Sequence, residues 1–271
     1  MTINFADQSG NGNDATPTNF PATIPTVAGP LGEDVAVFDG TDDYFTTPVD
    51  TTGWTAITMV GWCKTDFTGD DQAIVAGVHP TPMIRINNSN GRLALWSSTG
   101  GTARSLSSSD LRDGNWHFIG GSFDESDESY ALVADDTNSD TGTISGATIA
   151  ETGLQIGKYL ANADYFNGSL AYLAIFDTKL SVAQMQALHA ASTPAAYKAL
   201  AISYGAVGYW SMSDDSAAAR APHSSHACLI EGQLDWCEGT FHATAGSGTL
   251  DGKLWGQRTN GDGTVETAVD P

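Results

Sequence analysis

Residues 35–45 read VAVFDGTDDYF, and this stretch does more than any other to indicate the fold. An apolar run leads into an Asp-Gly pair, and a second apolar run follows the next two aspartates. Asp-Gly between two such runs is typical of a β-hairpin. We therefore expect strands at 35–38 and 44–47 that form a hairpin, with Phe38 and Tyr44 pointing into a core.

Short apolar runs of this kind recur along the chain, separated by turn residues. Residues 55–64 (TAITMVGWCK) are largely apolar on both alternating faces, which indicates a central strand buried on two sides. Asn88, Asn90 and Gly91 predict a turn between the strands expected at 83–86 and 93–96. Many short strands with turn chemistry between them are typical of a β-sandwich. Besides the three strands above, we expect strands at 73–78, 83–86, 93–96, 116–123, 130–134, 154–158, 169–176 and 206–212.

One short helix is expected near residues 181–190. Ser181 suits the N-cap position, and apolar side chains then recur at helical spacing. Thr193-Pro194 ends this helix, and a second helical turn is expected at 194–200.

The composition excludes some classes of partner. The chain has 271 residues, with 32 acidic and 11 basic side chains and a formal net charge of -21. Binding to nucleic acids or to anionic membranes needs a surplus of lysine and arginine on some face, so we expect neither partner. No run of about 18 apolar residues is present, so we expect no membrane-spanning helix. Residues 1–14 lack the regions of a signal peptide.

Four further motifs accompany the 35–45 stretch. They are DQSGNGND at 7–14, LRDGNWHFI at 111–119, IG at 156–157 with YFNGSL at 165–170, and KLS at 179–181. In this order they resemble the laminin-G-like jelly rolls of the concanavalin A-like lectin/glucanase superfamily, over about residues 3–190. The resemblance implies an all-β fold, a two-sheet antiparallel β-sandwich (jelly roll) with one short helix. We expect this domain at 1–213 and an irregular C-terminal extension or arm at 214–271.

Residues 207–212 (VGYWSM) resemble the strand that opens the sandwich in this family, although they lie near the other end of the chain. Two alternatives follow. The strand folds back in cis and closes its own sandwich, as in a circular permutation, or it completes a neighbouring copy in trans. In the second alternative, the partners are other copies of this chain or other virion proteins, which exchange strands or arms with it.

The resemblance also implies a structural calcium ion near the DQSGNGND loop, where Asp7, Asn11 and Asn13 match the family's motif. Ca2+ prefers several hard oxygens of this kind. Where the family commonly supplies another acid, this chain has LAYL at 170–173. The alternative is an Asx-rich turn that caps its own backbone.

Two more clusters carry metal-type ligands. Asp39, Asp42 and Asp43 form a second set of oxygens, which we interpret as turn chemistry. The other cluster lies beyond residue 214 and leaves open a zinc site, a disulfide between its two cysteines, or unligated side chains. Its members are His223, His226, Cys228, Cys237 and His242.

Sugar binding needs exposed aromatic rings beside a few polar groups. Four aromatic residues lie next to expected loops and are the candidates: Trp54, Trp96, Tyr159 and Tyr165. Glycosidases of this fold place carboxylates at alternating positions of one strand. Glu125, Asp127 and Glu128 lie in a turn without that spacing, so we expect no enzymatic activity.

These observations predict a non-enzymatic binding or structural module. The most specific expectation is a virion protein, a bacteriophage tail, fibre or capsid-decoration component that binds surface glycans and is assembled in the host cytoplasm. The alternatives are a carbohydrate-binding adhesion module of a secreted, extracellular bacterial protein and a degenerate glycoside hydrolase. Apart from calcium, no cofactor is expected.

Overall fold

The computed structural model describes residues 5–77, 81–97, 102–106, 110–136, 138–159 and 164–213. It also describes two short paired strands, β16 (Gln257–Thr259) and β17 (Val265–Thr267). The chain divides into two compact units, Met1–Asp214 and Asp215–Pro271. The histidines and cysteines of the zinc or disulfide hypothesis, Cys228 and Cys237 among them, lie outside the described residues.

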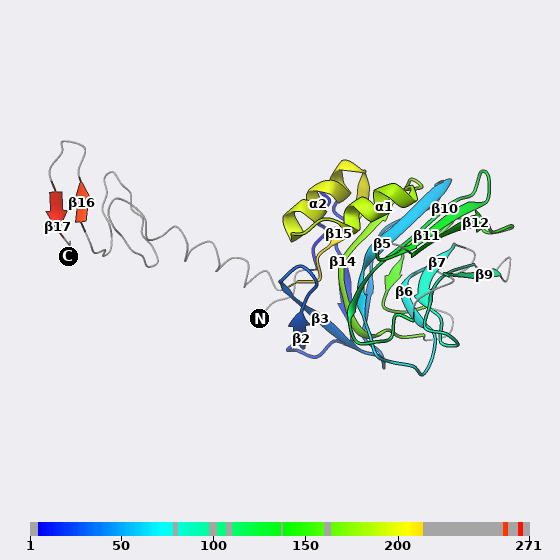
Figure 1. Ribbon diagram of the computed structural model, residues 1–271, viewed down its shortest axis with the longest axis horizontal. Coiled ribbons are helices and arrows are strands. Elements are labelled where there is room, and N and C mark those ends of the chain that lie inside the picture. The colour runs from blue at the N-terminus through cyan, green and yellow to red at the C-terminus, as the bar shows by residue number, and fades with distance from the viewer. Residues whose placement is uncertain are drawn as a thin grey trace. The chain divides into compact units, whose positions relative to one another are not determined.

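The first unit consists of two antiparallel sheets (Figure 1). The first sheet contains, in spatial order, β1 (Thr16–Thr18), β4 (Tyr44–Thr46), β13 (Gln155–Ile156), β6 (Gln72–Ala76), β7 (Met83–Ile86), β8 (Leu93–Ser97) and β9 (Thr102–Ser105). The second contains β12 (Asn138–Thr143), β11 (Ser129–Ala134), β10 (Trp116–Asp124), β5 (Ala56–Lys64), β14 (Asn167–Phe176), β3 (Asp34–Asp39) and β2 (Thr26–Ala28). A further strand, β15 (Ala206–Trp210), also pairs with β14. The predicted β-sandwich is confirmed.

The β5 strand is the central strand that the sequence predicted, because both of its faces are buried. Ile57 and Met59 face the core between the two sheets, whereas Val60 and Trp62 belong to a second apolar cluster on the outer side of the second sheet. Cys63 is also fully buried. A strand with two apolar faces needs cover on both sides, so the second sheet requires a further layer.

Two helices supply that layer (Figure 1). The first, α1 (Val182–His189), begins with a capping box in which Ser181 Oγ accepts a hydrogen bond from Gln184 N, and Gln184 Oε1 accepts one from Ser181 N. The second, α2 (Pro194–Ser203), is a full helix rather than the single turn that we expected. Met185 and Leu188 of α1 pack on the second sheet with the buried residues of α2. Neither of these described helices has the length and apolar character needed to cross a membrane.

The expected hairpin at 35–47 is wrong. Its first strand, β3, pairs with β2 and β14 in the second sheet, whereas β4 pairs with β1 and β13 in the first. Residues 39–43 therefore form a sheet-crossing loop. Phe38 and Phe45 are both buried in the core between the sheets, whereas Tyr44 is only partly buried and lies outside it. The sequence pattern locates the turn correctly but does not reveal which strand each half pairs with.

Residues 206–210 pair with β14 of the same chain, with Leu173 opposite Trp210 and Ala174 opposite Tyr209. Beyond β15 the chain runs beside β3, because Ala36 N of β3 donates to Met212 O and Val35 forms an antiparallel bridge with Ser213. Trp210 is fully buried in the core between the sheets, and its Nε1 donates to Asn13 O at 2.9 Å. The opening-type strand thus closes its own sandwich here, while exchange between copies stays a prediction.

We expect that Trp210→Ala lowers the free energy of unfolding by about 3–5 kcal/mol, because it leaves a large cavity in the core and removes the bond to the 7–13 loop. Urea unfolding at pH 7 measures this change. The control is Ile202→Ala, because Ile202 is 41% exposed on α2, and a change within about 0.5 kcal/mol is expected there. Equal effects of the two substitutions would contradict the expectation that Trp210 of β15 stabilises the core between the sheets.

Candidate functional site

A bulge in β6 shapes the outer face of the first sheet. Ala73 lies opposite Arg85 and Val75 lies opposite Ile84, so Ile74 is an extra residue. Both Ile74 and Val75 belong to the core between the sheets. Because of the bulge, two successive residues face the core, and the small residues on either side of them, Ala73 and Ala76, lie on the outer face of β6.

An aromatic pair lies on this outer face. The rings of Trp96 and Tyr159 are edge-to-face, with their centres 5.6 Å apart. They pack with Ala73, Ala76 and Met83 in a cluster separate from the core between the sheets. Tyr159 is 1% exposed, whereas Trp96 is only partly buried. Tyr159 thus packs beneath Trp96, and Trp96 is the more exposed ring of the pair.

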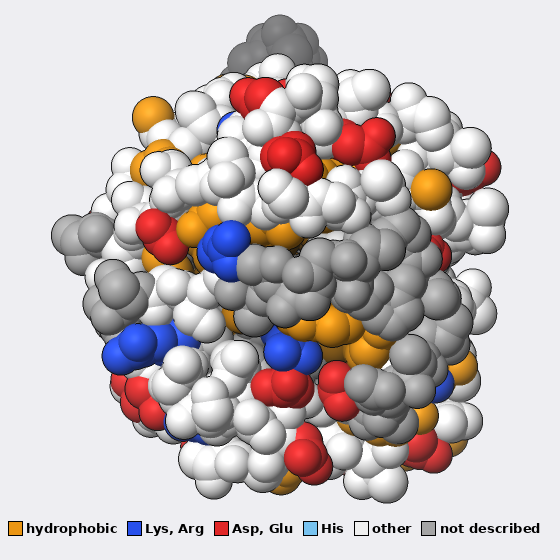
Figure 2. Space-filling model, turned by 90° about the vertical axis from the view of Figure 1, so that its right-hand side faces the viewer, with side chains coloured by type: hydrophobic (Ala, Val, Ile, Leu, Met, Phe, Trp, Pro, Cys, Tyr) orange, Lys and Arg blue, Asp and Glu red, His pale blue; other side chains and the backbone are white. Residues whose placement is uncertain are grey.

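Figure 2 looks onto the side of the molecule where β6, β7 and β9 lie in Figure 1. Hydrophobic side chains are visible on this side, with basic and acidic side chains next to them. An apolar surface with a few polar groups is a usual component of a small-molecule site.

Two polar atoms on this sheet are buried without a hydrogen-bond partner among the described residues. One is Nε of Arg85, whose guanidinium also forms an ion pair with Asp71 at 2.7 Å and lies 5.2 Å from the centre of the Trp96 ring. The other is Oε1 of Gln155, a residue that is 9% exposed. Such an orphaned atom costs about 1–3 kcal/mol, and a bound ligand or water would remove that cost.

Carboxylates make this face acidic. Burial raises the pKa of Asp164, and the negative charges of Asp71 and Asp70 raise it further, against the effect of Arg85. Burial likewise raises the pKa of Tyr159, to which the charge of Asp164 adds. Among the described residues whose charges act on Asp164, the two carboxylates of Asp70 and Asp71 outnumber the one guanidinium of Arg85.

Gln155 and Trp96 lie at the two ends of one row of the sheet, whereas Arg85 lies opposite Ala73 in another row. Gln155 lies opposite Ala76 on the neighbouring strand, and Met83 lies opposite Trp96 two strands further along. Four neighbouring strands span three gaps of about 4.8 Å, or roughly 14 Å. The row therefore suits an extended ligand better than a compact one.

Of the other two aromatic candidates, Tyr165 lies farther along the same sheet, beside Tyr44 of β4, and Trp54 lies elsewhere. Tyr165 pairs with Tyr44, their ring centres 6.4 Å apart, and Lys158 Nζ lies 4.4 Å from the centre of the Tyr44 ring and 5.1 Å from that of Tyr165. Trp54 packs against the core between the sheets. The sequence analysis thus found Trp96 and Tyr159, which lie together. It missed Arg85 and Gln155, for which the only signal in the sequence is that each is a polar residue within an apolar run.

The Asp7 loop binds the last strand of the sandwich. Asp7 Oδ1 accepts hydrogen bonds from Ser9 N and Tyr209 N, and Oδ2 accepts from Ser9 Oγ and Asn13 N, all at 2.8–3.0 Å. The side-chain amides of Asn11 and Asn13 both donate to Val207 O. A calcium ion at Asp7, Asn11 and Asn13 stays a prediction. The arrangement does not fit it, because the ion would have to displace the N–H and O–H groups that donate to the Asp7 carboxylate.

The Glu125–Glu128 turn uses its carboxylates to hold backbone. Glu125 Oε2 accepts from Ile149 N at 2.7 Å, and Glu128 Oε1 accepts from Gly146 N at 2.8 Å. Asp127 Oδ1 accepts from Ser129 N. The two glutamates therefore anchor the 144–149 loop, and Asp127 holds the start of β11. The arrangement does not resemble an acid and nucleophile facing one substrate.

Comparison with known proteins agrees with this fold. The profile of the concanavalin A-like lectin/glucanases superfamily, laminin G type, matches residues 39–186. No curated protein matches the chain. Domain 4 of the extracellular arabinanase AbnA from Geobacillus stearothermophilus, solved in complex with arabinotriose, is 19% identical, with a TM-score of 0.54 over 68% of this chain and 91% of that one.

Botulinum neurotoxin type C, whose cell entry is described as dependent upon interaction with two ganglioside molecules, is 12% identical, with a TM-score of 0.49. That match covers 69% of this chain and 49% of the toxin chain, so the present chain spans about half the length of that relative. At these identities the similarity concerns the fold alone.

Asp7→Asn tests the loop through its pH dependence. Burial alone would raise the pKa of Asp7, but the hydrogen bonds from Asn13, Ser9 and Tyr209 outweigh it and the pKa is lowered. The stabilisation is therefore present above the unfolded value near 3.8 and is lost as the pH falls through the lower pKa of the folded state. We expect Asp7→Asn to cost about 1–3 kcal/mol at pH 7, with the difference from wild type shrinking below pH 4. Urea unfolding at pH 7, 5 and 3 measures it, and the exposed Asp66→Asn serves as the control.

Proposed function

Because the chain belongs to the concanavalin A-like lectin/glucanase superfamily, we propose that it is a non-enzymatic carbohydrate-binding module. The binding face is the outer face of the first sheet. The single observation that carries this proposal is the Trp96–Tyr159 pair beside two buried polar atoms without partners, on Arg85 and Gln155.

A sugar matches the chemistry of this face. Its ring presents apolar C–H groups that stack on an aromatic side chain, and its hydroxyl groups both donate and accept hydrogen bonds. Trp96 offers the ring, Gln155 Oε1 accepts from one hydroxyl group, and Arg85 Nε donates to another. Each such bond would satisfy an atom that is otherwise buried without a partner.

The charge of the face favours a neutral sugar. Asp71 neutralises Arg85, and Asp164 and the 8% exposed Glu151 add negative charge nearby. Like charges across an interface are costly, so carboxylated sugars such as sialic acid are disfavoured. The arabinanase domain of similar fold was solved with arabinotriose, which carries no charge.

The proposal excludes hydrolysis, because the two glutamates closest to a glycosidase pattern hold the 144–149 loop instead. The biological setting is also part of the proposal: the surface of a virion, reached by assembly with other copies, or the exterior of a bacterial cell. Concentration-dependent assembly in light scattering would support the virion setting, whereas a monomer at all concentrations would favour an adhesion module.

We expect Trp96→Ala to weaken binding of a neutral oligosaccharide at least tenfold, or about 1.4 kcal/mol, because the stacking surface is removed. An array of neutral and sialylated oligosaccharides, arabinotriose included, identifies the ligand, and calorimetry then measures the affinity.

The matched control is Trp116→Ala. Trp116 is also partly buried, but it lies on β10 beside the helix-covered face and donates from Nε1 to Ala28 O. Binding that survives Trp96→Ala unchanged, or that prefers sialylated sugars, would refute the proposed face. Release of reducing ends from any ligand found would refute the non-enzymatic part.

A further inference from the structure

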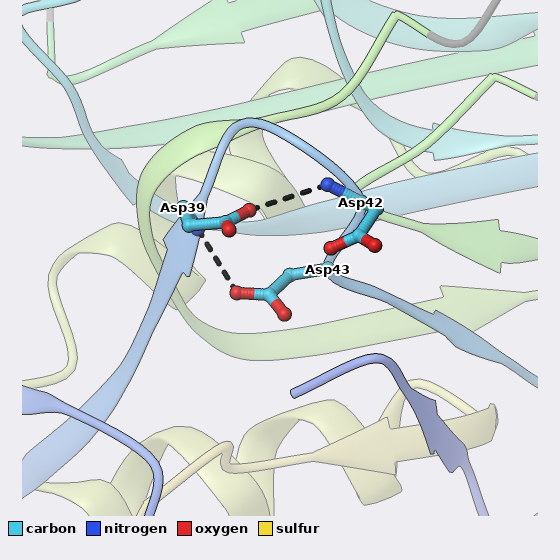
Figure 3. Close-up of side chains that lie close together, drawn as sticks. All are labelled: Asp39, Asp42 and Asp43. Carbon is cyan, nitrogen blue, oxygen red and sulfur yellow. Dashed lines mark hydrogen bonds between the residues drawn. The ribbon is translucent and has the colours of Figure 1, made fainter. Parts of the chain in front are cut away.

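Three aspartates gather on the sheet-crossing loop, residues 39–43 (Figure 3). One carboxylate oxygen from each of Asp39, Asp42 and Asp43 lies within 4.8 Å of the other two. Asp39 and Asp42 are exposed, whereas Asp43 is 2% exposed. Carboxylate oxygens at this spacing are the ligand type of a hard divalent cation.

Only some of these oxygens are needed to hold the loop. Asp39 Oδ1 accepts from Thr41 N at 2.7 Å and from Asp42 N at 3.3 Å, and Asp43 Oδ2 accepts from Asp39 N at 3.0 Å. The remaining oxygen of Asp43, Oδ1, is buried and has no hydrogen-bond partner among the described residues. A buried carboxylate oxygen without a donor is uncommon in a folded protein, and a bound cation accounts for it.

The charges around Asp43 are unbalanced. Within the part of the chain that the structure describes, none of the three aspartates forms an ion pair with a basic side chain. Burial raises the pKa of Asp43, and the negative charges of Asp39 and Asp42 raise it further, although the bond from Asp39 N opposes this. A bound cation would supply the missing positive charge.

We propose that the sheet-crossing loop binds a calcium ion through the carboxylates of Asp39, Asp42 and Asp43, with water completing the coordination. The spacing favours Ca2+ over Mg2+. Oxygens on opposite sides of Ca2+ lie up to about 5 Å apart, whereas those of Mg2+ lie only about 4 Å apart. The ion would join the end of β3 in one sheet to the start of β4 in the other. This site is distinct from the Asp7 loop and does not depend on the carbohydrate proposal.

The test uses the full chain and Ca2+ alone. We expect 1 mM CaCl2 to raise the Tm of the wild type by several degrees, more than MgCl2 at the same concentration or NaCl at the same ionic strength. The NaCl arm separates binding from simple screening of the net charge of -21.

Asp42→Asn is the main variant, because Asp42 is exposed and its carboxylate holds no part of the loop that the structure describes. Calorimetric Ca2+ affinity should fall at least tenfold in Asp42→Asn. In Asp43→Asn the increase in Tm should vanish, while the Tm without calcium stays equal to or above that of the wild type. Asp66→Asn, an exposed aspartate outside the loop, should retain the full response.

Three outcomes would overturn the proposal. They are no calcium effect beyond that of NaCl, an unchanged calcium affinity in both loop variants, and loss of the response in Asp7→Asn with retention in Asp42→Asn. The last outcome would place the ion in the Asp7 loop instead.

Discussion

The carboxylate of Asp7 accepts hydrogen bonds both from its own loop and from Tyr209 of β15, which lies about two hundred residues later in the chain. This contact holds β15 along β14, and β14 in turn pairs with β5, the central strand. Both helices rest on that sheet. The Asp7 contact therefore joins the start of the described chain to its last strand in the second sheet, next to the buried ring of Trp210.

Strong local signals explain the parts of the fold that could be predicted. The apolar run of β5 needs cover on both faces whatever its partner, so its central position follows from the sequence. The start of α1 is equally local, since Ser181 and Gln184 satisfy each other's backbone. The laminin-G-like motifs added the order of the elements, and their profile confirms the family over residues 39–186.

The remaining features depend on contacts that no local pattern encodes. Whether the two halves of VAVFDGTDDYF pair or separate is decided by β14 and β13, which are more than a hundred residues away. Arg85 and Gln155 matter because burial leaves one atom of each without a partner, and burial is a property of the assembled sheet. The aromatic candidates were easier to find than to place, because Trp54 and Trp96 look alike in sequence but only one lies on the outer face.

Because of the extra residue in β6, the two faces of this strand pack against different groups of side chains. Ile74 and Val75 carry the packing of the interior, while Ala73 and Ala76 are buried in the outer cluster with Tyr159 and Trp96. A larger side chain at either alanine would therefore press on the aromatic pair of Trp96 and Tyr159 and leave the volume of the core between the sheets unchanged. The position of the outer rings and the packing of the interior can thus change independently, although one strand carries both.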